Sequence, residues 1–167
     1  MKTARPKTRT EQHSISTLLA LISQAYNTRA WHGTNLRGSI RGLSMREAAW
    51  RPSPNRHNIW EIVVHCAYWK YIVRRRILGE KKGSFPLKGS NWFRRDATLS
   101  EHQWQSDVAL LESTHRSMCE AIARLNPADL SLKPRGSNVD NLAIIMGIAS
   151  HDLYHAGQIQ LLKRFVR

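Results

Sequence analysis

Cysteine is scarce in this sequence, which has only Cys66 and Cys119 among its 167 residues. Two thiols in segments of helical character argue against the disulfide framework of a small secreted domain, and they fit the reducing cytoplasm. Long hydrophobic runs are also missing, because the longest, residues 142–149, is far shorter than the roughly 20 residues that span a bilayer. The basic segment 1–10 precedes no adequate apolar stretch, so it is not a secretory signal. We therefore expect a cytoplasmic protein without a membrane partner.

Several familiar catalytic motifs are absent as well. The sequence has no glycine-rich loop that would cradle phosphates, no dinucleotide fingerprint, no nucleophile elbow and no C-x-x-C pair. A function must therefore rest on another kind of site.

Acidic residues are few, since 12 Asp and Glu stand against 26 Lys and Arg, and the net charge is +14. The excess is localised to residues 1–10, with four basic residues and no acid, and to residues 70–95, with nine basic residues and one acid. Trp92 and Phe93 in the second region could stack on bases or other planar ligands. Nucleic acid or another anionic partner is physically reasonable, but no motif that reads nucleic acid is present. Arg74, Arg75 and Arg76 point in successive directions around a helix, so we favour a contact of at least one of them with a helix end or another subunit. An anionic substrate near the metal is a competing use of the same charge.

Apolar residues recur at helical spacing, and no β-alternation of useful length occurs, so the sequence predicts an all-α fold. The helices are expected over about residues 12–35, 58–78, 100–122 and 138–165. Ser44 and Glu47 have capping-box spacing and predict a short helix or turn. Residues 80–98 form a long linker. Residues 1–11 are expected to be a basic, disordered tail, and residues 12–167 a single domain.

The most informative stretch is the last predicted helix, where His151 and His155 lie four residues apart on one face. They fall on the same stripe as Ile144, Ile148 and Leu162, which should face the core. Buried neutral imidazoles need partners for their polar nitrogens. Ligation of a metal ion supplies such partners, and so would other polar side chains or water, so the helix alone leaves both readings open.

A second predicted helix also carries a histidine at a core position. Its apolar stripe consists of Ile62, His65, Trp69 and Ile72. Cys66 points about 100° away around the helix and is a poor candidate for the same site. Three core-facing histidines on two helices would leave at least one coordination position open, as expected of a catalytic metal site.

Glu61 lies one turn before His65 and could reach the same region. We expect it instead to interact favourably with the helix dipole or to hydrogen-bond a histidine from outside the ligand set. The remaining histidines lie near helix ends or lack a partner at ligand spacing, and are interpreted as surface or capping residues: His13, His32, His57, His102 and His115.

Two separated blocks carry a family resemblance. Residues 43–52 end in Trp50-Arg51-Pro52 and lead into residues 59–65, which looks like a tryptophan-x-proline loop before a helix with the first histidine. Residues 151–159 are similar to an H-x-x-x-H-x-G-Q signature. In order and separation these blocks resemble the DinB/YfiT-like metalloenzymes, over about residues 14–166.

The resemblance implies a four-helix bundle in which His65, His151 and His155 hold a divalent metal ion. The family includes thiol-dependent S-transferases and isomerases that use bacterial low-molecular-weight thiols, and many members without an assigned activity. Zinc or nickel is favoured as the ion, and iron, manganese or copper stays open, because three imidazoles suit several of these metals.

We therefore predict a metal-dependent enzyme of the thiol S-transferase or hydrolase type that uses the ion as a Lewis acid. The alternative is a non-enzymatic anion- or nucleic-acid-binding helical protein with structural histidines. Tryptophan-rich helices and a basic loop exceed what a small monomer must expose, and related bundles often pair, so we expect a homodimer.

Overall fold

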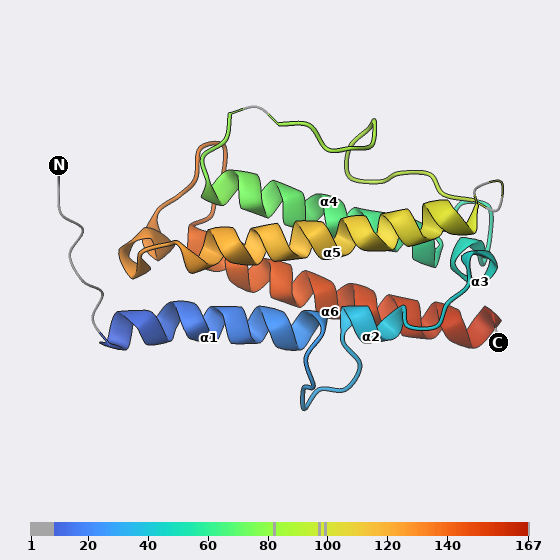
Figure 1. Ribbon diagram of the computed structural model, residues 1–167, viewed down its shortest axis with the longest axis horizontal. Helices are drawn as coiled ribbons and strands as arrows, with labels where there is room; N and C mark the ends of the chain where they lie inside the picture. Colours follow the sequence, from blue (N-terminus) through green and yellow to red (C-terminus); the bar gives the residue numbers. More distant parts are fainter. Residues whose placement is uncertain (1–8, 82, 97, 99, 167) are drawn as a thin grey trace.

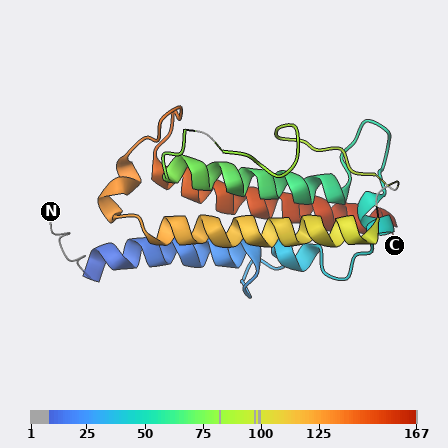
Figure 2. The same cartoon turned by 45° about the horizontal axis from the view of Figure 1, so that its top comes forward.

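The computed structural model describes residues 9–81, 83–96, 98 and 100–166. The described chain is helical and contains no strand, which confirms the all-α prediction. Its elements are α1 (Arg9–Tyr26), α2 (Leu36–Ser39), α3 (Met45–Ala49), α4 (Ile59–Ile77), α5 (Glu101–Ala123), the 3₁₀ helix η1 (Pro127–Ser131) and α6 (Asn141–Val166). The long helices α1, α4, α5 and α6 run side by side (Figures 1 and 2). None of the described helices is both long and apolar enough to cross a membrane.

Side-chain caps fix where most helices begin. The Asn58 side chain accepts a hydrogen bond from the Glu61 amide at the start of α4. Ser44 forms the predicted capping box with Glu47, and Ser100 forms another with Gln103 at the start of α5. Each cap gives a backbone N–H at the helix start a partner that the helix itself cannot supply. The predicted positions of these helices are confirmed.

The first predicted helix is wrong at both ends. It begins at Arg9, inside the segment expected to be a tail, and it ends at Tyr26 rather than near residue 35. The amides of Asn27 and Thr28 both bond back to the Ser23 carbonyl, and Asn35 then caps the separate helix α2. The intervening loop holds Trp31 fully exposed, so this residue does not continue the apolar stripe. Residues 1–8 of the predicted tail lie outside the described residues.

The first half of α4 lies in the middle of the protein, because residues 59–67 are all buried. Helices α3, α5 and α6 pack against α4, and the linker that follows it runs back along its outer side (Figure 1). Four apolar side chains of the linker pack into the apolar core around α4: Phe85, Leu87, Trp92 and Phe93. This cover places polar α4 side chains, His65 among them, in a water-poor setting.

A polar cluster lies inside the bundle beside this core. Lys70 and Asp152 are fully buried and form an ion pair, with 2.5 Å between Nζ and Oδ2. The ammonium group lies 5.0 Å from the ring centre of Tyr26, and Tyr26 stacks on His115 at 3.6 Å. The assignment of His115 to the surface or to a helix cap was wrong, because the residue is buried on α5. Burial lowers the pKa of His115 to about 3.

His115 should make the protein sensitive to acid. The unfolded chain takes up a proton at this imidazole near pH 6.5, whereas the folded protein resists it down to about pH 3. Stability due to the neutral ring is therefore present above pH 6.5 and falls as the pH drops, by about 2 kcal/mol at pH 5. His115→Phe keeps the stacking on Tyr26 and removes this titration. Urea unfolding at pH 7 and pH 5 should show a smaller loss in the variant; equal losses in both proteins would contradict the assignment.

Candidate metal centre

The three predicted histidines meet at one point. The Nε2 atom of His151 lies 3.1 Å from Nε2 of His65 and 3.2 Å from Nε2 of His155. Helix α4 supplies His65 and α6 supplies the other two, one turn apart. His65 and His155 are buried and His151 is half-buried. The group is compact enough to hold one metal ion.

Hydrogen bonds at Nδ1 fix the tautomers of His65 and His155. The Nδ1 atom of His65 lies 2.8 Å from the Asn91 carbonyl oxygen, which can only accept, so Nδ1 donates. The Nδ1 atom of His155 donates to Oε1 of Gln158 at 2.7 Å, while the amide nitrogen of Gln158 donates to the Tyr154 hydroxyl. Both neutral rings therefore direct an Nε2 lone pair at the shared point. Such outer partners orient metal-ligating histidines in other proteins.

The electrostatics of the cluster favour neutral imidazoles. Burial lowers the pKa of His151 to about 3 and that of His155 to about 4, and the neighbouring rings add to both effects. Burial also lowers the pKa of His65. At neutral pH all three rings are thus uncharged, and a neutral imidazole is the form that binds metal. The single proton that His151 Nε2 can carry satisfies at most one of these two lone pairs, whereas a cation at that point satisfies both.

A second group of possible ligands shares His151 with the first. It consists of Cys66, His151 and Asp152, whose ligand atoms lie within 4.8 Å of one another. Asp152 is already paired with the buried ammonium of Lys70, which would repel a metal ion at this place. Burial also raises the pKa of the Cys66 thiol well above its usual range. The histidine group is therefore the better cation site.

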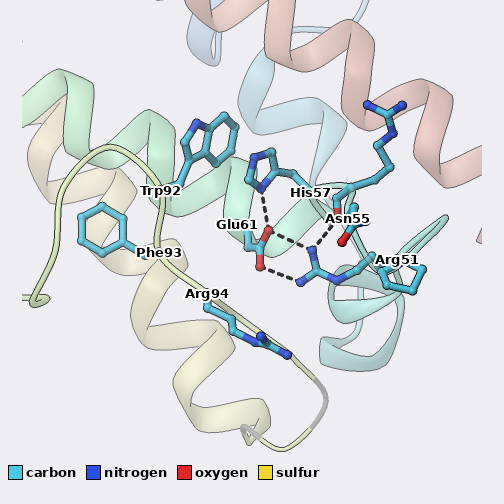
Figure 3. A pocket seen from close by; sticks show the side chains of 9 residues that line it. Arg51, Asn55, His57, Glu61, Trp92, Phe93 and Arg94 are labelled. Atoms are coloured by element: carbon cyan, nitrogen blue, oxygen red, sulfur yellow. Dashed lines mark hydrogen bonds and ion pairs between the residues drawn. The ribbon is translucent and has the colours of Figure 1, made fainter.

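Glu61 does not reach the three histidines. Its carboxylate pairs with Arg51 at 2.6 Å and accepts from Nδ1 of His57 at 2.8 Å (Figure 3). The residue occupies the first turn of α4, which agrees with the expected interaction with the helix dipole. The histidine that it orients is His57, which sequence reasoning had assigned to the surface or a cap.

Two residues of the linker complete the site, and neither was assigned to it from the sequence. The Trp92 ring stacks on two imidazoles, with ring centres 3.9 Å from that of His65 and 3.6 Å from that of His57. Figure 3 shows Trp92 beside His57. Asn91 has a positive φ of 64°, and its side chain accepts from the Trp69 indole N–H at 2.9 Å. The expectation that Trp92 and Phe93 stack on an external ligand is not supported, because Trp92 is sandwiched internally and Phe93 is buried.

A trough of about 500 Å³ lies beside the site, and His155 is the one of the three histidines that lines it. One wall is apolar and consists of Ile62, Leu161, Leu162 and Phe165. The rim carries Arg56, His57 and Tyr154. Beyond His57 and Trp92 lies a second hollow of about 350 Å³, lined by Arg51, Arg56 and Arg94 among others. The trough therefore offers an apolar surface and one cationic group, Arg56, beside the histidines.

Asn91 should matter for metal binding although it touches no metal-facing nitrogen. Its left-handed backbone presents the carbonyl to His65, and the hydrogen bond from Trp69 holds that conformation. We expect Asn91→Ala to weaken zinc binding by roughly tenfold, because alanine tolerates a positive φ poorly and loses the indole contact. Asn91→Gly, which tolerates the backbone conformation, should weaken binding less. Competition titration with a chelating dye measures both, and wild-type affinity in Asn91→Ala would refute this role.

Comparison with known proteins gives one family. The family model described as DinB superfamily matches residues 28–159, which include His65, His151 and His155. No curated protein and no solved structure matches the chain. The matched region runs from the loop before α2 into α6 and covers most of the sequence. The chain therefore belongs to the DinB superfamily.

Proposed function

We propose that this protein is a metal-dependent enzyme in which His65, His151 and His155 hold one divalent ion. The observation that carries the proposal is the convergence of three Nε2 atoms, at 3.1 and 3.2 Å, beside an open trough. A structural site would use four protein ligands and be closed, whereas three ligands leave a position for a reactant. Zinc or nickel is the favoured ion, and iron, manganese or copper is compatible with imidazole ligands.

The favoured reaction is transfer of a low-molecular-weight thiol, with hydrolysis as the next candidate. An ion held by these histidines supplies Lewis-acid chemistry, because it lowers the pKa of a thiol or water beside it. In the transfer, the sulfur forms a bond to an electrophilic carbon, the leaving group departs with its electron pair, and the thiol proton passes to a base.

His57 is the proposed base. Its Nδ1 atom donates to Glu61, so a neutral ring keeps the lone pair on Nε2, and the side chain is half-exposed at the rim of the trough. A carboxylate that orients an imidazole in this way is a common arrangement for proton transfer. Trp92, stacked between His57 and His65, fixes the spacing of the base from the metal centre.

The trough also indicates what the substrate looks like. Its apolar wall suits an apolar portion of the substrate, and the guanidinium of Arg56 at the rim suits an anionic group. The proposed substrate is therefore a small amphipathic anion that reaches toward His155.

The test is a thiol-conjugation assay on zinc-loaded protein, with a panel of low-molecular-weight thiols and an electrophilic acceptor. We expect activity that needs zinc, disappears in His155→Ala and falls in His57→Gln, whereas His57→Gln keeps its zinc. Glutamine is similar in size and polar but cannot accept the proton. Loss of zinc in His57→Gln would mean that His57 only supports the fold of the site, and absence of transfer and hydrolysis in zinc-loaded protein would overturn the proposed reaction.

The second candidate is a non-enzymatic binder of nucleic acid or other anions. One observation favours it: a groove of about 530 Å³ at the end of α4 is lined by Arg75, Arg76, Lys81 and Arg135. Against it, the Glu80 carboxylate pairs with Arg74 at 2.6 Å and with Arg75 at 4.0 Å, which neutralises part of this charge. Salt-sensitive binding of nucleic acid that ignores His151→Ala but is lost on replacing Arg76 and Arg135 would support the candidate.

The compartment and the assembly are also proposals. We propose a cytoplasmic location, because Cys66 and Cys119 are both free thiols and a reducing compartment keeps them so. The homodimer expected from the sequence stays a proposal too.

A further inference from the structure

The hollow beyond His57 and Trp92 is strongly basic for its size. Its lining holds three guanidinium groups and one carboxylate, which belong to Arg51, Arg56, Arg94 and Glu61. Its volume of about 350 Å³ lies at the small end of the range for ligand pockets. The hollow therefore suits a small anionic group rather than a large cofactor.

The one carboxylate in this lining balances only part of the positive charge. The Glu61 oxygens accept four hydrogen bonds, two from Arg51, one from His57 Nδ1 and one from the Arg95 amide. Burial opposes ionisation of Glu61, but these bonds outweigh burial and lower the pKa of the group. Glu61 is therefore ionised, and the guanidinium of Arg51 balances its charge at 2.6 Å. The charges of the other two arginines remain.

The guanidinium groups of Arg56 and Arg94 have weak partners within the protein. Arg56 forms no ion pair within the part of the chain that the structure describes. Arg94 lies 3.4 Å from Asp96, but its side chain is 87% exposed, and an exposed pair of this kind contributes little to stability. Guanidinium forms charge-assisted hydrogen bonds with carboxylate and phosphate oxygens. Both groups are therefore available to an anion that enters the hollow.

Arg51 holds together the two segments that carry these arginines. Its guanidinium donates to the Arg56 carbonyl in the loop before α4 and, at 3.2 Å, to the Arg95 carbonyl in the linker. The Asn58 side chain donates to the same Arg95 carbonyl at 2.7 Å. Figure 3 shows the Arg51–Glu61 pair joining the loop to α4, with Arg94 on the linker. A backbone that is fixed before the ligand arrives loses less entropy on binding.

We propose that this hollow is a binding site for an oxyanion group, phosphate or carboxylate, and that Arg56 and Arg94 bind it. The hollow and the trough share three lining residues, Arg56, His57 and Trp92. One ligand can therefore lie across both, with its anionic end in the hollow and its apolar portion in the trough. The substrate class is then a molecule with separate apolar and anionic parts. This last step rests on the proposed function, whereas the anion site itself does not.

Isothermal titration calorimetry of the metal-free protein with inorganic phosphate tests the site, at constant ionic strength so that screening stays equal. We expect saturable binding of one phosphate per chain. Titration with acetate, the carboxylate probe, shows which oxyanion the site prefers. Arg56→Gln and Arg94→Gln should each weaken phosphate binding about tenfold, because each removes a charge-assisted hydrogen bond. The matched control is Arg76→Gln, which removes a guanidinium from the other basic groove, at the end of α4, and should bind phosphate as the wild type does.

Three results would overturn the anion site: no saturable binding of either anion, wild-type affinity in Arg56→Gln or Arg94→Gln, or loss of binding in Arg76→Gln. Both arginines of the site are exposed, so circular dichroism should show native helix content in their variants. Phosphate binding without any turnover of the zinc-loaded protein would contradict only the proposed function. Where turnover occurs, Arg94→Gln should raise the KM for an anionic acceptor about tenfold and leave the KM for a neutral analogue unchanged. An unchanged KM for the anionic acceptor would overturn the substrate class.

Discussion

Zinc should stabilise the wild-type protein and leave the His151→Ala variant unchanged. A ligand that binds only the folded state at 100 times its Kd raises the free energy of unfolding by about 2.7 kcal/mol. Removing His151 takes away the ring whose Nε2 lies between those of His65 and His155, at 3.1 and 3.2 Å. The remaining two imidazoles then hold the ion by two ligands, and we expect affinity to fall by more than roughly 100-fold. Thermal unfolding with and without zinc measures the effect.

The control for this experiment is His102→Ala, which removes an exposed histidine on α5 and keeps the total histidine count equal to that of the variant. It should be stabilised by zinc as fully as the wild type. The His151→Ala variant should keep its helix content, since its apolar neighbours Ile144, Ile148 and Ile159 remain buried. Zinc stabilisation that persists in His151→Ala would show that the ion binds elsewhere.

Lys70→Met should cause the largest loss of stability. Lys70 is fully buried, and its ammonium pairs with Asp152 at 2.5 Å. Methionine has a similar length but no charge, so the variant leaves a buried carboxylate without its cation. Breaking a buried pair in this way costs about 3–5 kcal/mol. Urea unfolding of the metal-free protein at neutral pH measures the change.

The matching double variant separates the charge from the shape. Lys70→Met combined with Asp152→Leu replaces both charges by apolar groups, and such replacements are often neutral or stabilising. We expect the double variant to recover most of the stability that Lys70→Met loses. A double variant as unstable as the single one would mean that packing of the lysine chain, rather than the unpaired carboxylate, accounts for the loss.

Most of the helices and the histidine cluster could be predicted from the sequence, because they rest on local signals. Ser44, Asn58 and Ser100 cap helices within three residues of their own position, so their effect depends on short spacings that the sequence displays. His151 and His155 share one helix face by the same logic of spacing. From spacing alone, His65 could be predicted only to face the core; the family resemblance indicated that it shares a site with His151 and His155.

What the sequence could not show depends on contacts between distant segments. His115 interrupts α5 like an ordinary polar residue, and its burial follows from the packing of Tyr26 on its ring. Asn91 and Trp92 lie in a linker without periodicity, yet the linker folds back over α4 and places them on His65. The predicted end of the first helix was wrong for the opposite reason, because the local apolar pattern continues past the point where the chain turns at Asn27.

The most direct test of the metal centre is X-ray absorption spectroscopy of the zinc-loaded protein. Three imidazole ligands predict a first shell of nitrogen and oxygen at about 2.0–2.2 Å, with the outer-ring scattering of three histidines and no sulfur. That result would place the ion among His65, His151 and His155. A sulfur ligand at about 2.3 Å would instead place zinc on Cys66 with His151 and Asp152, and would contradict a centre built from three histidines.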